Sequence, residues 1–370
     1  MIQHTDHFHG SDLEKIEQTF GIRKEEIISF SANINPLGLS ENLKAYLSSH
    51  LDVITTYPDR EYTGLSNAIS EYTKCNPENI IVGNGATELI SLFFSAISPK
   101  KALIIGPTYS EYEREISLSG GQIHYYFTKE ENDFRFQMSD FLMEMKKDYD
   151  LVILCNPNNP TSTTLTKREL STILSKLNEQ NGYLLVDETY VEFVDNVEEI
   201  SAVSLTEQFS NLVVLRGISK FFASPGLRLG YGITGNKDLL SFIKEHKNPW
   251  TINSVAEAAG SFMFRDKAYI KKTSDYIKEE RNFVCKSLAS IEGLKIYKST
   301  CNFVLVKITK EGINADILFD YCIKKKFMIR NCSSFQSLNN LYFRVCFMRH
   351  EDNLALLNSI KEAMEQAYFL

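Results

Sequence analysis

Short apolar runs alternate with longer amphipathic stretches between about Asn79 and Thr234. The runs read NIIVGNG, KALIIGP, LVILCNPNNP, YLLVDE, NLVVLRG and RLGYGIT, and they end in polar or glycine-rich turns. Continuous rather than alternating hydrophobicity is typical of strands that are covered on both faces. Most runs are followed by a stretch with helical periodicity, such as KRELSTILSKLNEQ. The pattern predicts an α/β fold with a mainly parallel central sheet.

Beyond Trp250 the pattern changes. A long charged helical stretch, AYIKKTSDYIKEERNFVCKSLASI, leads to the alternating segments NFVLVKI, FMIRN and LYFRVCF and to a final helix. This part favours a second, smaller α+β domain. We therefore predict a large domain over residues 45–248 and a small domain over residues 249–370. The arm of residues 1–44 has no sheet pattern of its own and is expected to pack on the small domain.

Composition and charge narrow the class of protein. The 370 residues are 43% hydrophobic and 24% charged, as in an ordinary globular protein of two domains. A net charge of −7 argues against binding to nucleic acid or to an anionic membrane. The seven cysteines are scattered, without a C-x-x-C pair, which argues against a zinc site and favours a reducing, cytoplasmic location. No apolar segment is long enough to span a membrane.

The groups able to do chemistry follow the apolar runs. In an open α/β sheet, ligands bind beyond the carboxyl ends of the strands. After IIVG, the segment containing Gly85, Ala86 and Thr87 begins a helix, whose free N–H groups form an anion site. A plain strand-to-helix turn is the alternative. The dinucleotide fingerprint lacks its third glycine and no P-loop lysine follows, so a nucleotide site is not indicated.

Three further polar residues stand at the ends of later strands. Asn159 lies in the NPNNPT turns, Asp187 ends the run YLLV, and Lys220 follows VVLRGIS. A buried carboxylate or lysine is costly unless it has a partner or a function. Taken singly, Asp187 could be a helix cap and Lys220 a lysine that extends to solvent at a strand end.

Together, these residues match the requirements of pyridoxal phosphate. Lys220 would bond to the cofactor's aldehyde, Asp187 would pair with its protonated ring nitrogen, and Tyr109 would stack on its ring. These three form the predicted catalytic set. The remaining predicted contacts go to the cofactor's phosphate and phenolic oxygen. They come from Gly85, Ala86, Thr87, Ser219 and Arg228 for the phosphate, and from Asn159 and Tyr190 for the phenolic oxygen.

The segments NPNNPT, VDETYVEF, SKFFASPGLRLGY and YFRVCFMRHEDN resemble those of fold-type-I pyridoxal-phosphate enzymes over almost the whole chain. The resemblance is greatest to the branch that holds histidinol-phosphate aminotransferase and L-threonine-O-3-phosphate decarboxylase. HFHGSD, ISFSANINPLG and YPDREY look more like the decarboxylase. Three departures stand out: Gly217 replaces a usual Ser or Thr, NPTS replaces NPTG, and SSFQSLNN lacks a Gly-Leu pair.

The resemblance also implies a set of substrate contacts. Arg344 would bind the substrate's α-carboxylate, while Arg330, with His9 and Asn33, would hold its phosphate. Tyr57 resembles a tyrosine that reaches into the neighbouring subunit's site, which implies a homodimer with shared active sites. For His9, a solvated position in the arm is the alternative, and Arg349 is interpreted as a surface ion pair.

What the resemblance implies for function is decarboxylation of L-threonine O-3-phosphate to (R)-1-amino-2-propanol phosphate for cobalamin synthesis. The alternative is an aminotransferase for histidinol phosphate or an aromatic amino acid. A ligand-sensing protein without catalysis is a third hypothesis, which the presence of the lysine, the aspartate and both arginines disfavours. The choice between decarboxylation and transamination depends on which bond at the substrate's α-carbon is held perpendicular to the cofactor ring.

Overall fold

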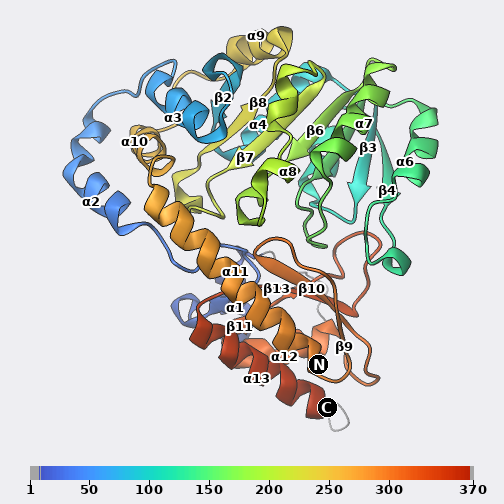
Figure 1. Ribbon diagram of the computed structural model, residues 1–370. Helices are drawn as coiled ribbons and strands as arrows, with labels where there is room; N and C mark the ends of the chain where they lie inside the picture. The colour runs from blue at the N-terminus through green and yellow to red at the C-terminus, as the bar shows by residue number, and fades with distance from the viewer. Residues whose placement is uncertain (1–7, 9, 367–370) are drawn as a thin grey trace.

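A mostly parallel seven-stranded sheet forms the upper part of the molecule (Figure 1). The computed structural model describes residue 8 and residues 10–366. The strand order is β2-β8-β7-β6-β5-β3-β4, and only β8 runs antiparallel to its neighbours. The strands are β2 (Ile80–Gly83), β3 (Lys101–Gly106), β4 (Gln122–Phe127), β5 (Leu151–Cys155), β6 (Tyr183–Asp187), β7 (Leu212–Gly217) and β8 (Gly230–Ile233). The predicted α/β class with a mainly parallel sheet is confirmed.

Helices cover both faces of this sheet, which explains the continuous apolar runs. In β5, Leu151 and Ile153 pack into a cluster with α4, α5 and α9, whereas Val152 and Leu154 face the opposite cluster with α7. β4 was not expected from the sequence, because it is a partly buried edge strand. The helices are α2 (Glu41–Ser49), α3 (Thr63–Thr73), α4 (Gly85–Ile97), α5 (Glu111–Leu118), α6 (Met138–Glu144), α7 (Lys167–Asn178), α8 (Val197–Ile200) and α9 (Lys237–His246).

A four-stranded antiparallel sheet of order β12-β13-β10-β9 lies below the large sheet (Figure 1). Its strands are β9 (Leu294–Ile296), β10 (Phe303–Ile308), β12 (Arg330–Asn331) and β13 (Tyr342–Cys346). The helices of this half of the chain are α10 (Ser254–Met263), α11 (Lys267–Ala289), α12 (Ala315–Lys324) and α13 (His350–Gln366). α10 packs against α2 and α3, and the long helix α11 leads from that region to the small sheet.

The N-terminal segment lies beside the small sheet. It forms α1 (Leu13–Phe20) and a two-residue strand, β1 (Ile28–Ser29), which pairs in parallel with β11 (Phe327–Met328). The sequence shows no sheet pattern in this arm because a strand of two residues is too short to show alternation. The domain boundaries after residues 44 and 248 stay predictions.

A loop of the large sheet contacts the small sheet directly. Glu130, which follows β4, binds Lys307 of β10 at 2.8 Å and accepts a hydrogen bond from Tyr297 at 2.9 Å. Burial raises the pKa of Glu130, but hydrogen bonds from Lys307, Tyr342 and Tyr297 outweigh that effect and lower it to about 2. We call this contact the Glu130 bridge. It joins the loop after β4 to the small sheet.

Candidate active site

A cavity of about 710 Å³ lies beyond the carboxyl ends of β5, β6 and β7, facing the small sheet. This is the place where an open α/β sheet binds its ligands. The structure brings most of the predicted site residues together around it. Those lining the cavity are Asn33, Ala86, Thr87, Tyr109, Asn159, Asp187, Tyr190, Ser219, Lys220, Arg228, Arg330 and Arg344. Their functional roles remain predictions, but their convergence from distant parts of the chain is a structural fact.

Two of the predicted residues that the structure describes, Gly85 and Tyr57, do not line the cavity. Gly85 lies just behind it, with φ +75°, and a Cβ atom there would meet Arg228 at 2.5 Å. Its left-handed conformation favours glycine, and any side chain there would displace the Arg228 guanidinium. Tyr57 is 81% exposed and packs on Trp250 at a centroid distance of 5.0 Å. His9 lies outside the described residues.

Lys220 lies in the turn that follows β7, with its Nζ donating a hydrogen bond to the carbonyl of Ala32 at 2.7 Å. Desolvation, followed by the nearby Arg344 guanidinium, lowers the pKa of Lys220 to about 8. An amine with this pKa has a substantial neutral fraction near neutral pH. Because the neutral amine is the nucleophile, Lys220 is suited to bond with an aldehyde.

Asp187 ends β6 and presents its carboxylate to the cavity, where its side chain is 5% exposed. Oδ1 accepts hydrogen bonds from the backbone N–H and the hydroxyl of Thr189, at 2.9 and 2.5 Å. Oδ2 accepts one from the Tyr112 hydroxyl at 2.6 Å. Asp187 thus closes a turn with Thr189 and does not cap a helix. Tyr112 and Thr189 were not among the predicted residues.

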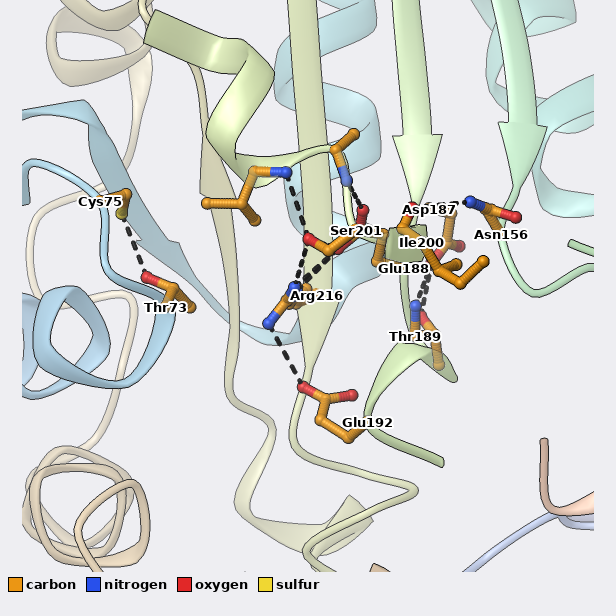
Figure 2. Close-up of polar contacts among 12 residues, drawn as sticks. Thr73, Cys75, Asn156, Asp187, Glu188, Thr189, Glu192, Ile200, Ser201 and Arg216 are labelled. Carbon is orange, nitrogen blue, oxygen red and sulfur yellow. Dashed lines mark hydrogen bonds and ion pairs between the residues drawn. The ribbon is translucent and has the colours of Figure 1, made fainter. Parts of the chain in front are cut away.

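The residue after Asp187 points the other way (Figure 2). Glu188 is fully buried and receives hydrogen bonds from Arg216 of β7 at 2.9 and 2.8 Å and from Ser201 at 2.9 Å. Asn156 donates its backbone N–H to the Asp187 carbonyl at 2.8 Å. These contacts fix the backbone on either side of the Asp187 side chain, so its direction into the cavity is set by the sheet.

The start of α4 and Arg228 lie together at one end of the cavity. Ala86 and Thr87, in the first turn of α4, line it beside the Arg228 guanidinium. At Gly217 a Cβ atom would meet only Ala86 Cβ, at 4.0 Å. There is therefore room for the usual Ser or Thr, and this chain simply lacks that hydroxyl. Helix N–H groups and a guanidinium are the donors that a phosphate requires.

Arg330 and Arg344 approach the cavity from the small sheet, where they are directly opposite each other on β12 and β13. Arg344 donates hydrogen bonds to Asn159 Oδ1 and to the carbonyl of Ser31. Burial, followed by the charge of Arg344, lowers the pKa of Arg330 to about 10. Within the described part of the chain, neither guanidinium forms an ion pair with a carboxylate. Like charges in opposed positions are destabilising unless an anion lies between them.

Asn33 lies between the two sheets, with a left-handed φ of 56°. Its Nδ2 donates to the Tyr190 hydroxyl at 3.3 Å, while its carbonyl accepts a bond from Asn302 at 2.8 Å. The Oδ1 of Asn33 and the hydroxyls of Ser31 and Thr108 are buried without a hydrogen-bond partner in the described protein. All three residues line the cavity. Unpartnered buried polar atoms of this kind are what a polar ligand would satisfy.

Two of the departures from the expected motifs make contacts between the sheets. Ser162, in the NPTS segment, is fully buried with φ 59°, and its hydroxyl accepts the N–H groups of Thr300 and Cys301 at 2.8 and 3.2 Å. Gln336, in the SSFQSLNN loop, donates to Glu113 at 2.9 Å and to the Tyr125 hydroxyl at 3.1 Å. Both loops therefore have ordered partners across the gap.

These features define a pyridoxal-phosphate enzyme site, and the chain belongs to the family aminotransferase class I and II, whose model matches residues 25–360. Membership of this family confirms pyridoxal phosphate as the cofactor. The cavity fits the group: it offers an amine, a carboxylate with a free acceptor position, and an anion site at the start of α4.

Two curated relatives and one solved structure show which members of the family this chain is similar to. A protein of Caldanaerobacter subterraneus subsp. tengcongensis, named provisionally as a threonine-phosphate decarboxylase, is 39% identical over 90% of each chain. The threonine-phosphate decarboxylase of Salmonella typhimurium is 29% identical over 96% of each chain. The histidinol-phosphate aminotransferase of Clostridium acetobutylicum is 32% identical, with a TM-score of 0.85 over 91% of this chain and 99% of the other.

Other classes of site are not seen in the described residues. No group of three or more histidine, cysteine, aspartate or glutamate side chains there could hold a metal ion. Among the described helices, none combines the length and apolar character that crossing a bilayer requires.

Proposed function

We propose that this protein is a decarboxylase that converts L-threonine O-3-phosphate to (R)-1-amino-2-propanol phosphate in cobalamin biosynthesis. The observation that carries the proposal is the pair of arginines, Arg330 and Arg344, in register on β12 and β13. Within the described protein neither forms an ion pair with a carboxylate, and the charge of Asp12, which acts on Arg330, is more distant. A substrate with both a carboxylate and a phosphate would supply one anion to each guanidinium. Two relatives named as threonine-phosphate decarboxylases, one of them provisionally, support the same substrate.

In this proposal Arg344 holds the α-carboxylate. Arg344 is 4% exposed, and its guanidinium is held by Asn159, by Ser31 and by the Phe303 ring at 5.1 Å. A planar donor fixed in this way can set the orientation of a carboxylate, and orientation decides which bond at the α-carbon is weakened. When bound, pyridoxal phosphate accepts into its ring the electrons of the bond that breaks.

Arg330 would hold the substrate's phosphate, with Asn33 and His9 as further contacts. Its guanidinium is anchored by the carbonyl of Phe8, by the Ser334 hydroxyl at 3.0 Å and by the Phe335 ring at 5.3 Å. Arg330 is half-buried whereas Arg344 is buried, so we place Arg330 nearer the mouth of the cavity. This order suits a substrate whose amine and carboxylate enter first.

Lys220 would form the covalent bond to the cofactor and then move a proton at the substrate's α-carbon. With a pKa of about 8, its amine can both accept and release a proton near neutral pH. In the decarboxylase it would return a proton to the carbon that has lost CO₂. In an aminotransferase it would instead remove the α-proton.

An aminotransferase acting on histidinol phosphate is the second candidate. The similarity to the C. acetobutylicum aminotransferase, 32% identical over nearly the whole of that chain, favours it. Its amino-donor half-reaction would also place two anions in the cavity if the donor were a dicarboxylic amino acid. Residue identity alone does not separate the two reactions.

We also propose that the enzyme is a homodimer with shared active sites. Tyr57, Leu51 and Ile54 are 81%, 55% and 67% exposed, and Trp250 beside Tyr57 is 43% exposed. Large apolar side chains gathered on a surface favour an interface. Sedimentation should therefore give twice the mass of one chain, and Tyr57→Ala should complement a Lys220→Ala variant in mixed dimers.

One paired assay tests the reaction. The purified protein with pyridoxal phosphate is given L-threonine O-3-phosphate, without and with 2-oxoglutarate. The proposal expects CO₂ release and 1-amino-2-propanol phosphate without any keto acid. Strict dependence on 2-oxoglutarate, with formation of glutamate, would instead establish the aminotransferase.

A further inference from the structure

Tyr112 stands out among the cavity residues because its hydroxyl donates a hydrogen bond to the Asp187 carboxylate. It lies on α5, one turn after Tyr109, and its ring packs edge-on against Tyr109 at 5.7 Å. The side chain is fully buried, and its hydroxyl donates to Asp187 Oδ2 at 2.6 Å. A fully buried tyrosine needs such a partner, so the bond alone does not separate a structural role from a functional one.

The distribution of hydrogen bonds over the Asp187 carboxylate favours a functional role for Tyr112 over a purely structural one. An ionised carboxylate has about four acceptor positions, two on each oxygen. On Oδ1 both are taken, by the N–H and the hydroxyl of Thr189. On Oδ2 only one is taken, by Tyr112, within the described residues. The free acceptor position of the carboxylate is therefore on the oxygen that Tyr112 holds.

We propose that Tyr112 is the positioning residue that directs Asp187 Oδ2 to the pyridine nitrogen of pyridoxal phosphate. The inference rests on the role proposed above for Asp187 as the partner of that nitrogen. Thr189 anchors one oxygen and Tyr112 fixes the rotation of the carboxylate, so that the remaining lone pair of Oδ2 has one direction. Burial, followed by the charge of Asp187, raises the pKa of Tyr112 well above its ordinary value, so the hydroxyl keeps the proton it donates.

The test compares two cofactors on the apoenzyme, without substrate. The deaza analogue of pyridoxal phosphate has carbon in place of the ring nitrogen, so it cannot bond to Asp187. Wild-type protein should bind pyridoxal phosphate more tightly than the analogue, as measured by fluorescence titration. In Tyr112→Phe this preference should fall by about tenfold, the size expected for a hydrogen bond to a charged group.

Tyr149→Phe is the matched control. Tyr149 is 2% exposed and donates to the Glu144 carboxylate at 2.6 Å, in a part of the chain that does not line the cavity. It should keep the wild-type preference for pyridoxal phosphate, and the thermal unfolding of both apo variants shows whether each one folds. Thr189→Val is the second variant. It keeps the backbone N–H on Oδ1 and should reduce the preference less than Tyr112→Phe does.

Three results would overturn the proposal. These are an equal loss of affinity for both cofactors in Tyr112→Phe, a preference unchanged from wild type, and a larger effect of Thr189→Val. An absence of any preference in the wild-type protein would remove the role of Asp187 on which the proposal depends. Because no substrate is present, the outcome does not depend on whether the enzyme decarboxylates or transaminates.

Discussion

The two walls of the cavity are built on different principles. One wall consists of turns after parallel strands, where Asp187 and Lys220 follow directly from buried runs. The other wall is the face of an antiparallel sheet, where Arg330 and Arg344 are opposed across β12 and β13. The first wall is rigid because its strands are covered on both faces. The second wall gathers like charges, which an anionic ligand would neutralise. The residues proposed to bind the cofactor thus lie on one wall, and those proposed to select the substrate lie on the other.

The largest expected effect is the loss of Lys220. In Lys220→Ala we expect catalysis to fall by about 10³-fold or more, since both covalent binding and proton transfer are removed. Borohydride should then leave no cofactor adduct on the peptide that contains position 220, as measured by mass spectrometry. Lys247→Ala is the control, because Lys247 also has a pKa lowered by burial and donates to a carbonyl, that of Val82 at 2.8 Å. A cofactor adduct that is retained in Lys220→Ala would contradict the assignment of Lys220 as the residue that bonds to the cofactor.

Removing the buried ion pairs behind Asp187 should give the next largest effect, a loss of stability. Arg216→Met leaves Glu188 and Glu192 buried without their cation (Figure 2), and we expect a loss of about 3–5 kcal/mol in the free energy of unfolding. Denaturant titration measures it. Arg265→Met is the matched control, since its pair with Glu71 at 2.8 Å is exposed and should contribute less than about 1 kcal/mol. Equal losses would show that the buried pair does not stabilise this strand end.

Arg330→Ala tests the second wall, which holds Arg330 and Arg344. We expect kcat/KM for L-threonine O-3-phosphate to fall by about 10- to 100-fold, because a charged hydrogen-bond partner of the phosphate is lost. The rate with unphosphorylated L-threonine should change little. Arg349→Ala, at an exposed position after β13, should leave both rates unchanged. Equal losses for the two substrates in Arg330→Ala would remove Arg330 from the phosphate role.

The smallest effect concerns the Glu130 bridge between the two walls. The pKa of Glu130 in the folded protein, about 2, lies below its ordinary value of 4.5, so its contribution to stability is present above pH 4.5 and is lost as the pH falls towards 2. Glu130→Gln should therefore be less stable than wild type at pH 6, with a difference that shrinks on acidification. Unfolding curves at several pH values measure it. Glu131→Gln, whose contact with Lys129 at 3.8 Å is exposed, should show no such trend.

The first wall was more accessible to sequence reasoning than the second. Lys220 and Asp187 could be located because each ends an apolar run, and the run fixes which edge of the sheet they reach. The opposition of Arg330 and Arg344 could not be derived, because register across two short strands leaves no local signal. Tyr112 was missed for a similar reason: its partner is 75 positions away in the chain. Its spacing of one helical turn from Tyr109 was the available signal.

The serine of the NPTS segment has a mechanical consequence. Ser162 ties the turn that carries Asn159 to residues 300–301 just before β10, in a backbone conformation that costs a serine more than a glycine. A segment that is bonded at one point can rotate only about that point. Gln336, which donates hydrogen bonds to Glu113 and Tyr125, is a second attachment, so the small sheet cannot rotate about Ser162 without breaking those two bonds.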